Sequence, residues 1–213
     1  MSYARKAKDN YNAKLPIYLF TYYIKEKEPS FNDFVNFIID EKIAKKYACE
    51  YFQLELDKLI NGKKINDIAN YINYKMKENE FVYDGQKYIK HFEKILSRAD
   101  FNELISIKKC SYCGISKEQI SFLGGEKMLY NKRSDTRGYS LEIDRKNPNK
   151  EYTRDNCCMS CYWCNNAKTD EFSVKEFKEI ARGLNMIWNT RFKNINSCER
   201  IYFPENSVIW DTP

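Results

Sequence analysis

The sequence has 213 residues, of which 43% are hydrophobic and 31% are charged. Enough apolar side chains are present to bury a core, so the composition excludes a wholly disordered chain. The length suits one moderate domain or a small module with a helical companion. The formal net charge of +6 permits binding to nucleic acid without demonstrating it, because acidic proteins and lipids would be attracted by the same charge.

The longest apolar run covers residues 15–24 and is about half as long as a membrane-spanning helix. The basic residues Arg5, Lys6, Lys8 and Lys14 precede it, as in a signal peptide, but the polar sequence IKEKEPS follows it without a small-residue cleavage pattern. We therefore expect a cytoplasmic protein with no membrane segment. In that compartment the eight cysteines are expected to be thiols or metal ligands rather than disulfides.

Residues 1–108 form the first predicted domain and are expected to be helical. Ser30 is the expected start of a long amphipathic pattern over residues 31–60, and helical spacing of apolar residues resumes over 65–76 and 88–96. The apolar faces are most simply a core. Their use as a dimer interface or as a DNA-recognition surface is the alternative.

Two smaller features of the first domain carry expectations of their own. Asn61 and Gly62 are typical turn residues and are expected to end the pattern that precedes them. His91 is the only histidine, and it stands among the apolar residues of the last helical stretch. We expect it at the surface or at the edge of the core.

The second predicted domain covers residues 109–190, and a C-terminal extension covers 191–213. Residues 140–146 alternate between apolar and polar side chains and predict a strand, which a turn at 147–150 follows. A second short strand is expected near 156–159. Together with the helical first domain, these strands predict an α+β fold.

A helix is expected after the second strand. It should open at a cysteine pair, run through Asn165 and Lys168, and continue into residues 172–184. Ser173 is a plausible N-cap, either within this helix or at the start of a second one.

Two Cys-x-x-Cys pairs, Cys110 with Cys113 and Cys161 with Cys164, predict a structural zinc site. Each tight turn can place two thiolates on one metal, and two pairs complete a tetrahedral site with no open position. Redox-active dithiols are the alternative. Cys158 and Cys161 form an overlapping pair, but Cys161 and Cys164 are preferred, because Asn165 and Lys168 then stand in the motif described next.

The segment from Arg137 to Lys168 resembles the finger of the HNH (ββα-metal) nucleases. The sequence RGYSLEIDRKNPNKEYTRDN, followed by CYWCNNAK, matches a strand that ends in an acidic residue, a hairpin, and a C-x-x-C-N helix. In that family a histidine follows the acidic residue, whereas Arg145 stands there in this chain. The same replacement occurs in a branch of rare-cutting restriction endonucleases within the family, which the sequence CSYCGIS at 110–116 also resembles.

The resemblance implies roles for the residues that match the motif. Asp144 and the side-chain carbonyl of Asn165 would hold a catalytic Mg²⁺, for which hard oxygen ligands are suited. Taken alone, Asp144 could equally cap the following turn, and Asn165 could be a helix cap. Lys168 could reach a phosphate or be a solvated helix lysine, and the Asn156 side chain is expected to tie the hairpin backbone.

Arg145 is too weak an acid to act as a general base, but it can bind phosphate with two donors and stabilise developing charge. The nucleophile then needs another activator, and the resemblance suggests a tyrosine. Tyr139 is the candidate and Tyr112 the alternative. In either case a tyrosine that merely packs over the finger is the simpler interpretation.

These features predict a DNA endonuclease that hydrolyses phosphodiester bonds, and a type II restriction enzyme acting as a homodimer on double-stranded DNA is the preferred form. A phage or homing-type nicking nuclease and a degenerate finger that binds DNA without cutting are the alternatives. The resemblance covers residues 109–190 and does not extend to residues 1–108, so it implies nothing about the target sequence.

Overall fold

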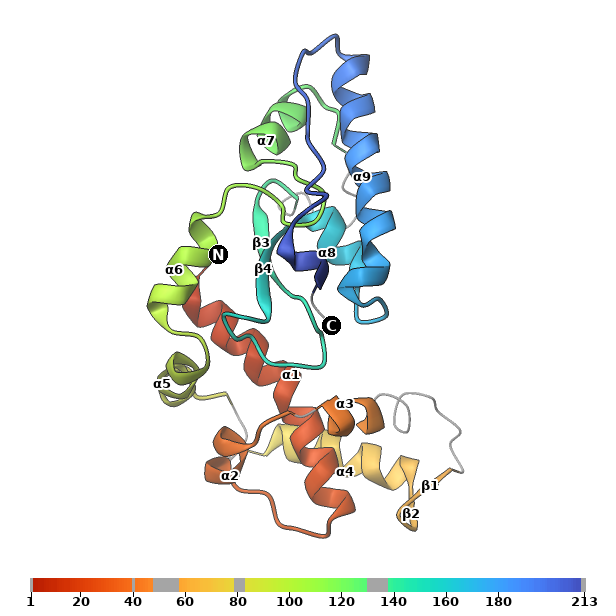
Figure 1. Cartoon of the computed structure of the whole chain (residues 1–213). Coiled ribbons are helices and arrows are strands. Elements are labelled where there is room, and N and C mark those ends of the chain that lie inside the picture. Colours follow the sequence, from red (N-terminus) through yellow and green to blue (C-terminus); the bar gives the residue numbers. More distant parts are fainter. Residues whose placement is uncertain (1, 40, 48–57, 79–82, 130–137, 212–213) are drawn as a thin grey trace. The chain divides into compact units, whose positions relative to one another are not determined.

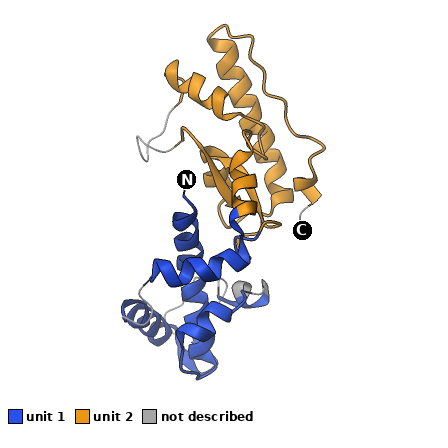
Figure 2. Cartoon of the chain, turned by 90° about the vertical axis from the view of Figure 1, so that its left-hand side faces the viewer, with its two compact units in different colours: residues 1–98, 149–153 blue, residues 99–148, 154–213 orange. Residues whose placement is uncertain are grey.

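The computed structural model describes residues 2–39, 41–47, 58–78, 83–129 and 138–211 (Figure 1). The chain forms two compact units, one of residues 1–98 with 149–153 and one of residues 99–148 with 154–213 (Figure 2). The described elements are helices with two small antiparallel sheets, which confirms the predicted α+β class. No helix in the described ranges is long and apolar enough to cross a membrane.

The first unit is largely helical. Its elements are α1 (Tyr3–Ile24), α2 (Phe31–Asn36), α3 (Glu41–Tyr47), β1 (Leu59–Ile60), β2 (Lys63–Lys64), α4 (Ile65–Lys77) and α5 (Gly85–Ile95). Helix α1 runs through the unit and contacts α3, α4 and α5, and it buries aromatic side chains such as Tyr11, Tyr18 and Phe20.

The amphipathic pattern over residues 31–60 does not form one helix, in contrast to the prediction. Helix α2 ends at Asn36, Phe37 has extended backbone, and Ile38 is 74% exposed. Residues 48–57, which include Cys49, lie outside the described residues. Asn61 and Gly62 do form a turn, but with φ values of 50° and 78° they join β1 to β2, as two-residue hairpin turns require.

A row of polar residues on α1 holds residues 149–153, which belong to the first unit. The Lys14 Nζ lies 3.4 Å from Glu151 Oε1, and the backbone N–H of Tyr152 donates to Asn10 Oδ1 at 3.3 Å. The ammonium of Lys6 lies 4.4 Å from the centre of the Tyr152 ring. Lys6, Asn10 and Lys14 are spaced four residues apart and so share one face of the helix, which explains why this polar row is buried.

The second unit contains a small sheet covered by helices. Its elements are α6 (Arg98–Ser106, beginning at the last residue of the first unit), α7 (Lys117–Gly125), β3 (Leu141–Arg145), β4 (Cys157–Cys161), α8 (Tyr162–Lys168), α9 (Val174–Asn194) and the 3₁₀ helix η3 (Val208–Asp211). Helix α8 contacts both strands and α9, and α9 contacts η3. The core of this unit includes Tyr112, Ile120, Phe177, Trp188 and Phe192.

The predicted strand–turn–strand–helix order is confirmed. Strands β3 and β4 pair antiparallel, with Leu141 opposite Cys161 and Arg145 opposite Cys157. Helix α8 begins directly after Cys161, whose Sγ accepts a hydrogen bond from the backbone N–H of Cys164. Ser173 is the N-cap of α9 and forms a capping box with Glu176, which confirms the second of the two cap positions considered.

Candidate metal centre and active site

The four predicted zinc ligands, Cys110, Cys113, Cys161 and Cys164, come together in the second unit. All are buried, and their Sγ atoms lie within 4.8 Å of one another. The Cys113 and Cys161 sulfurs are 3.7 Å apart. Four thiolates around one zinc at about 2.3 Å would be separated by about 3.8 Å, so the cluster is compatible with a zinc site.

Local backbone geometry shapes this cluster. Gly114 has a φ of +81°, and a Cβ there would lie 2.4 Å from the carbonyl oxygen of Tyr202, so only glycine fits after the first pair. The amide of Asn185 in α9 donates to the carbonyl oxygens of Cys113 and Ile201, at 2.9 and 3.2 Å. The C-terminal segment is therefore fastened across the first cysteine turn.

The cysteines also differ in their electrostatic surroundings. Burial raises the pKa of the Cys161 and Cys164 thiols well above the usual value. Several adjacent thiolates in so buried a cluster would need a cation to stabilise their charge, which zinc would supply. Cys158 is not part of the cluster. Among the described residues the sulfurs that come together are those of Cys110, Cys113, Cys161 and Cys164, which resolves the overlapping pair in favour of Cys161 with Cys164.

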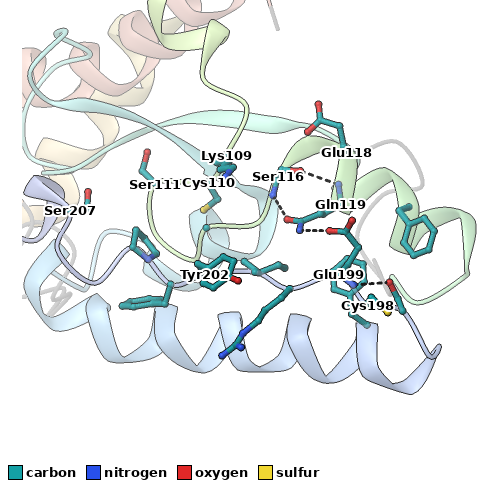
Figure 3. A pocket seen from close by; sticks show the side chains of 18 residues that line it. Lys109, Cys110, Ser111, Ser116, Glu118, Gln119, Cys198, Glu199, Tyr202 and Ser207 are labelled. Atoms are coloured by element: carbon teal, nitrogen blue, oxygen red, sulfur yellow. Dashed lines mark hydrogen bonds between the residues drawn. The ribbon is translucent and has the colours of Figure 1, made fainter.

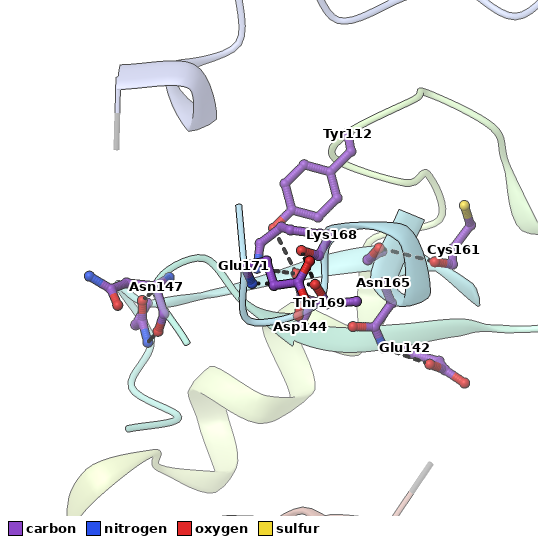
Figure 4. Close-up of polar contacts among 11 residues, drawn as sticks. Tyr112, Glu142, Asp144, Asn147, Cys161, Asn165, Lys168, Thr169 and Glu171 are labelled. Carbon is purple, nitrogen blue, oxygen red and sulfur yellow. Dashed lines mark hydrogen bonds and ion pairs between the residues drawn. The ribbon is translucent and has the colours of Figure 1, made fainter. Parts of the chain in front are cut away.

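Asp144 lies on β3 near its end, and two groups hold one of its carboxylate oxygens. The Tyr112 hydroxyl donates to Oδ2 at 2.8 Å, and the Lys168 Nζ lies 3.5 Å from the same atom (Figure 4). Burial raises the pKa of Asp144, while the Lys168 charge and the Tyr112 hydrogen bond oppose the rise. Within the described residues neither contact involves Oδ1, so that oxygen remains for a ligand.

Lys168 is not a solvated helix lysine, because its side chain is 1% exposed and its ammonium faces Asp144. That alternative is therefore wrong. Asp144 does not cap the hairpin turn either. Asn156 does so, because its Oδ1 accepts from the Asn147 N–H and its Nδ2 donates to the Asn147 carbonyl, both at 2.9 Å. The structural role predicted for Asn156 is confirmed.

Asn165 stands in α8, one residue after Cys164. Its Nδ2 donates to Glu142 Oε2 at 2.7 Å, as Figure 4 shows. Glu142 and Asp144 are two residues apart on β3 and therefore point to the same face of the sheet. Asn165 and Lys168 reach that face from α8, so the three predicted residues Asp144, Asn165 and Lys168 meet there.

Two predicted catalytic residues remain, Arg145, which follows Asp144 on β3, and Tyr139, which precedes that strand. Arg145 is half-buried and stands opposite Cys157 in the strand register, and its positive charge opposes the rise that burial causes in the pKa of Asp144. Tyr139 is 47% exposed, and its ring lies against Gly124 at the end of α7. Arg137, part of the quoted motif, lies outside the described residues.

Tyr112 is the tyrosine that reaches Asp144, but it is fully buried and its hydroxyl is already a donor. Burial, with the nearby Cys158 and Asp144, raises the pKa of Tyr112 far above the usual value. A nucleophilic role for Tyr112 is therefore not supported, and its geometry is that of a group orienting Asp144. The sequence motif missed this role and that of Glu142, although Glu142 could have been found from its spacing of two residues from Asp144.

A pocket of about 1120 Å³ lies beside the first cysteine turn, which contains Cys110 (Figure 3). Residues of α7 and of the C-terminal segment line it, and Gln119 Nε2 donates across it to Glu199 Oε2 at 3.0 Å. Cys110 contributes to its wall, but Asp144, Arg145 and Asn165 do not. The surface that carries Asp144 is therefore separate from this pocket.

Oxygen donors on the Asp144 face suit a hard divalent cation. Asp144 offers Oδ1, and Asn165, whose nitrogen is engaged by Glu142, has its carbonyl oxygen on the other end of the amide. Carboxylate and amide oxygens are ligands that Mg²⁺ accepts alongside water and substrate phosphate oxygens. The donor set thus fits Mg²⁺, and the adjacent cysteine cluster, with soft ligands only, does not compete for it.

No family model and no curated protein matches this chain. Among solved structures the chain is similar to one described as the rare-cutting HNH restriction endonuclease PacI, which is said to perturb DNA. The sequence identity is 19%, the match covers 65% of this chain and 90% of that chain, and the TM-score is 0.36. A likeness of this degree carries no argument about function.

Proposed function

We propose that this chain is a DNA endonuclease of the HNH type, which hydrolyses phosphodiester bonds with a bound divalent cation. The observation that carries the proposal is the face shared by β3 and α8. There a carboxylate with one unengaged oxygen, Asp144, and an oriented amide, Asn165, meet beside a buried cluster of four cysteines. Zinc in the cluster would fix the strand against the helix, which positions the two ligands.

Each residue has a stated task in this proposal. Asp144 Oδ1 and Asn165 Oδ1 hold the cation, while Tyr112 and Lys168 keep the Asp144 carboxylate in place through Oδ2. Arg145, next along the strand, binds the scissile phosphate with its two-donor fork and stabilises the charge that develops on it. When bound, the cation polarises the phosphodiester and stabilises the leaving oxygen.

Tyr139 is the candidate for activating water or for attacking the phosphate directly. Tyr139 is 47% exposed, in contrast to the buried Tyr112. The preferred form of the enzyme is a type II restriction endonuclease that acts as a homodimer in the cytoplasm. Residues 1–108 would supply dimer contacts or recognition, residues 109–190 the nuclease module, and residues 191–213 an extension.

A second candidate function is favoured by the ion pair between Lys168 and Asp144. A buried ammonium 3.5 Å from the carboxylate already neutralises part of its charge. This arrangement would suit a degenerate finger that binds DNA without a cation.

Both candidate functions are tested by incubating purified, zinc-replete protein with phage DNA, in the presence of either Mg²⁺ or a chelator. We expect discrete fragments that form only with Mg²⁺. Single-strand nicks would favour the phage or homing-type nicking nuclease, and DNA retention without cleavage would favour the degenerate finger and contradict the endonuclease.

A further inference from the structure

Glu142 forms a hydrogen bond that bears directly on Asn165. Its Oε2 accepts from Asn165 Nδ2 at 2.7 Å, and both side chains are half-buried on the face shared by β3 and α8 (Figure 4). Asn165 is the fourth residue of α8 and follows Cys164 of the cysteine cluster. The backbone of Asn165 is therefore fixed by the cluster, and its side chain by Glu142.

The direction of this hydrogen bond decides which end of the amide faces a cation. A carboxylate at neutral pH accepts hydrogen bonds and donates none, so it engages the amide nitrogen and turns the carbonyl oxygen away. A hard cation requires that oxygen, because the amide nitrogen carries two hydrogens and is not a ligand for it. Without Glu142 the amide could rotate by half a turn and present its nitrogen to the ion.

We propose that Glu142 is a positioning residue of the cation site, which holds the Asn165 amide so that Oδ1, and not Nδ2, faces the ion held by Asp144. The inference rests on the proposed function, in which Asp144 and Asn165 are the cation ligands. Partners that orient metal ligands commonly contribute about 10- to 100-fold to metal affinity, so the effect is large enough to measure.

The helix itself does not depend on Glu142. The Cys161 sulfur caps α8 by accepting from the Cys164 N–H at 3.4 Å, and zinc would fasten Cys161 and Cys164 to the first cysteine turn. Loss of the Glu142 carboxylate should therefore free the Asn165 amide while leaving the helix in place. A Glu142 variant can therefore show whether this residue positions a ligand without also testing whether it supports the fold.

The experiment measures Mn²⁺ binding by electron paramagnetic resonance on the zinc-replete full chain without DNA. Glu142→Ala should weaken Mn²⁺ binding by about 10- to 100-fold. Glu142→Gln keeps an acceptor but can also donate to Asn165 Oδ1, so both amide orientations become available and a smaller loss is expected. Glu126→Ala is the control, because Glu126 is an exposed carboxylate at the end of α7, and it should leave Mn²⁺ binding unchanged.

A double-mutant cycle distinguishes positioning from a general effect. In an Asn165→Ala background the amide is gone, so Glu142→Ala should change the Mn²⁺ dissociation constant by less than about two-fold. An equal loss in both backgrounds, or wild-type affinity in Glu142→Ala, overturns the inference. Zinc content is measured on each variant, and if Glu142→Ala loses zinc, the isosteric Glu142→Gln carries the test.

DNA cleavage by the wild type is measured in parallel. A wild type that cuts DNA but binds Mn²⁺ independently of Glu142 overturns this inference and leaves the endonuclease in place. A wild type whose Mn²⁺ binding depends on Glu142 but which cuts no DNA supports the inference and contradicts the endonuclease. A wild type that neither cuts nor binds Mn²⁺ overturns both.

Discussion

Arg145 follows Asp144 at the position where HNH nucleases carry a general-base histidine. A guanidinium has N–H donors and no acceptor, so Arg145 cannot take a proton from water. Its planar fork suits a phosphate, and its charge is near enough to Asp144 to oppose the rise in the pKa of that carboxyl, so we propose that it binds the phosphate next to the cation.

We expect Arg145→Ala to reduce the single-turnover rate of DNA cleavage by about 100- to 1000-fold, the usual loss for one group that stabilises a transition state. Arg145→Lys should recover only part of the rate, because a point charge does not reproduce the two-donor geometry. Arg145→His should not restore it. Tyr139→Phe, compared in the same assay, should lose activity by a comparable factor. Near wild-type cleavage by Arg145→Ala would contradict the phosphate-binding role.

His91 lies half-buried in α5 beside the Tyr88 ring, and its Nε2 is buried with no hydrogen-bond partner among the described residues. This placement agrees with the expected core-edge position. Burial, reinforced by the charges of Lys14 and Lys94, lowers the pKa of His91 from 6.5 to about 4. The imidazole is therefore neutral in the folded protein at neutral pH.

The pKa shift predicts how stability depends on pH. Below about 6.5 the unfolded chain binds a proton at His91 that the folded chain does not bind until about pH 4. The contribution of His91 is thus present above pH 6.5 and is lost as the pH falls toward 4. Urea unfolding at pH 7 and pH 5 should show a larger drop for the wild type than for His91→Gln, and equal drops would refute the shift.

For single residues, the sequence predicted the candidate ligands but not the groups that contact them. The four cysteines and the Asp144–Asn165 pair are recognisable because their chemistry depends on type and spacing. The neighbours that orient them do not show in spacing alone. Lys168 was expected to be solvated or to contact phosphate, and its burial against Asp144 depends on how α8 packs on β3.

Among the elements of the second unit, the two cysteine turns bring four buried sulfurs together. The first turn lies under the C-terminal segment, and the second caps α8, so four buried sulfurs connect segments that are far apart in the sequence. Because such a cluster has little apolar surface of its own, bound zinc would contribute folding free energy, on the order of 10 kcal/mol in small zinc modules.

We predict one tightly bound zinc per chain, held by Cys110, Cys113, Cys161 and Cys164. Cys161→Ser should lose the zinc and lower the melting temperature, because it removes one of the four ligands while the serine hydroxyl can still cap α8. Cys198→Ser is the matched control, since Cys198 is exposed and outside the cluster, and it should change neither quantity. Elemental analysis and thermal unfolding check this. Folded, active protein that contains no zinc would rule the site out.

The elements were predictable where local signals agreed and not elsewhere. Alternation over residues 140–146 and the Ser173 capping box are local, and β3 and the start of α9 follow them. The pattern over residues 31–60 was equally periodic, yet it breaks after Asn36. There Phe37 packs its ring against Tyr18 of α1 instead of continuing the turn, which is a contact that periodicity does not encode.

For the whole molecule, the two compact units do not follow the boundaries that the sequence motifs predict. Residues 149–153 fall within the motif segment of the sequence but belong to the first unit, because Lys14 and Asn10 of α1 hold them. No pattern in the sequence pairs a buried lysine with a glutamate about 140 residues away. The functional division into residues 1–108, 109–190 and 191–213 remains a prediction about activity.

Cutting both strands of a duplex with one nuclease module per chain requires two copies, and a two-fold dimer matches a palindromic site. We therefore predict that the protein is a homodimer on double-stranded DNA, with residues 1–108 supplying the interface or the recognition surface. Light scattering of the protein with a cleavable duplex in Ca²⁺ should give the mass of two chains per DNA. A single chain per duplex, combined with double-strand cleavage, would count against it.

The central claim is that Asp144 and Asn165 hold the cation on which DNA cleavage depends. The most direct measurement is Mg²⁺-dependent cleavage of phage DNA by the wild type, Asp144→Ala and Asn165→Ala, with zinc content and DNA binding determined on the same preparations. We predict fragments from the wild type alone, and all three proteins should retain one zinc and bind DNA alike. Cleavage at the wild-type rate by either variant would contradict the account.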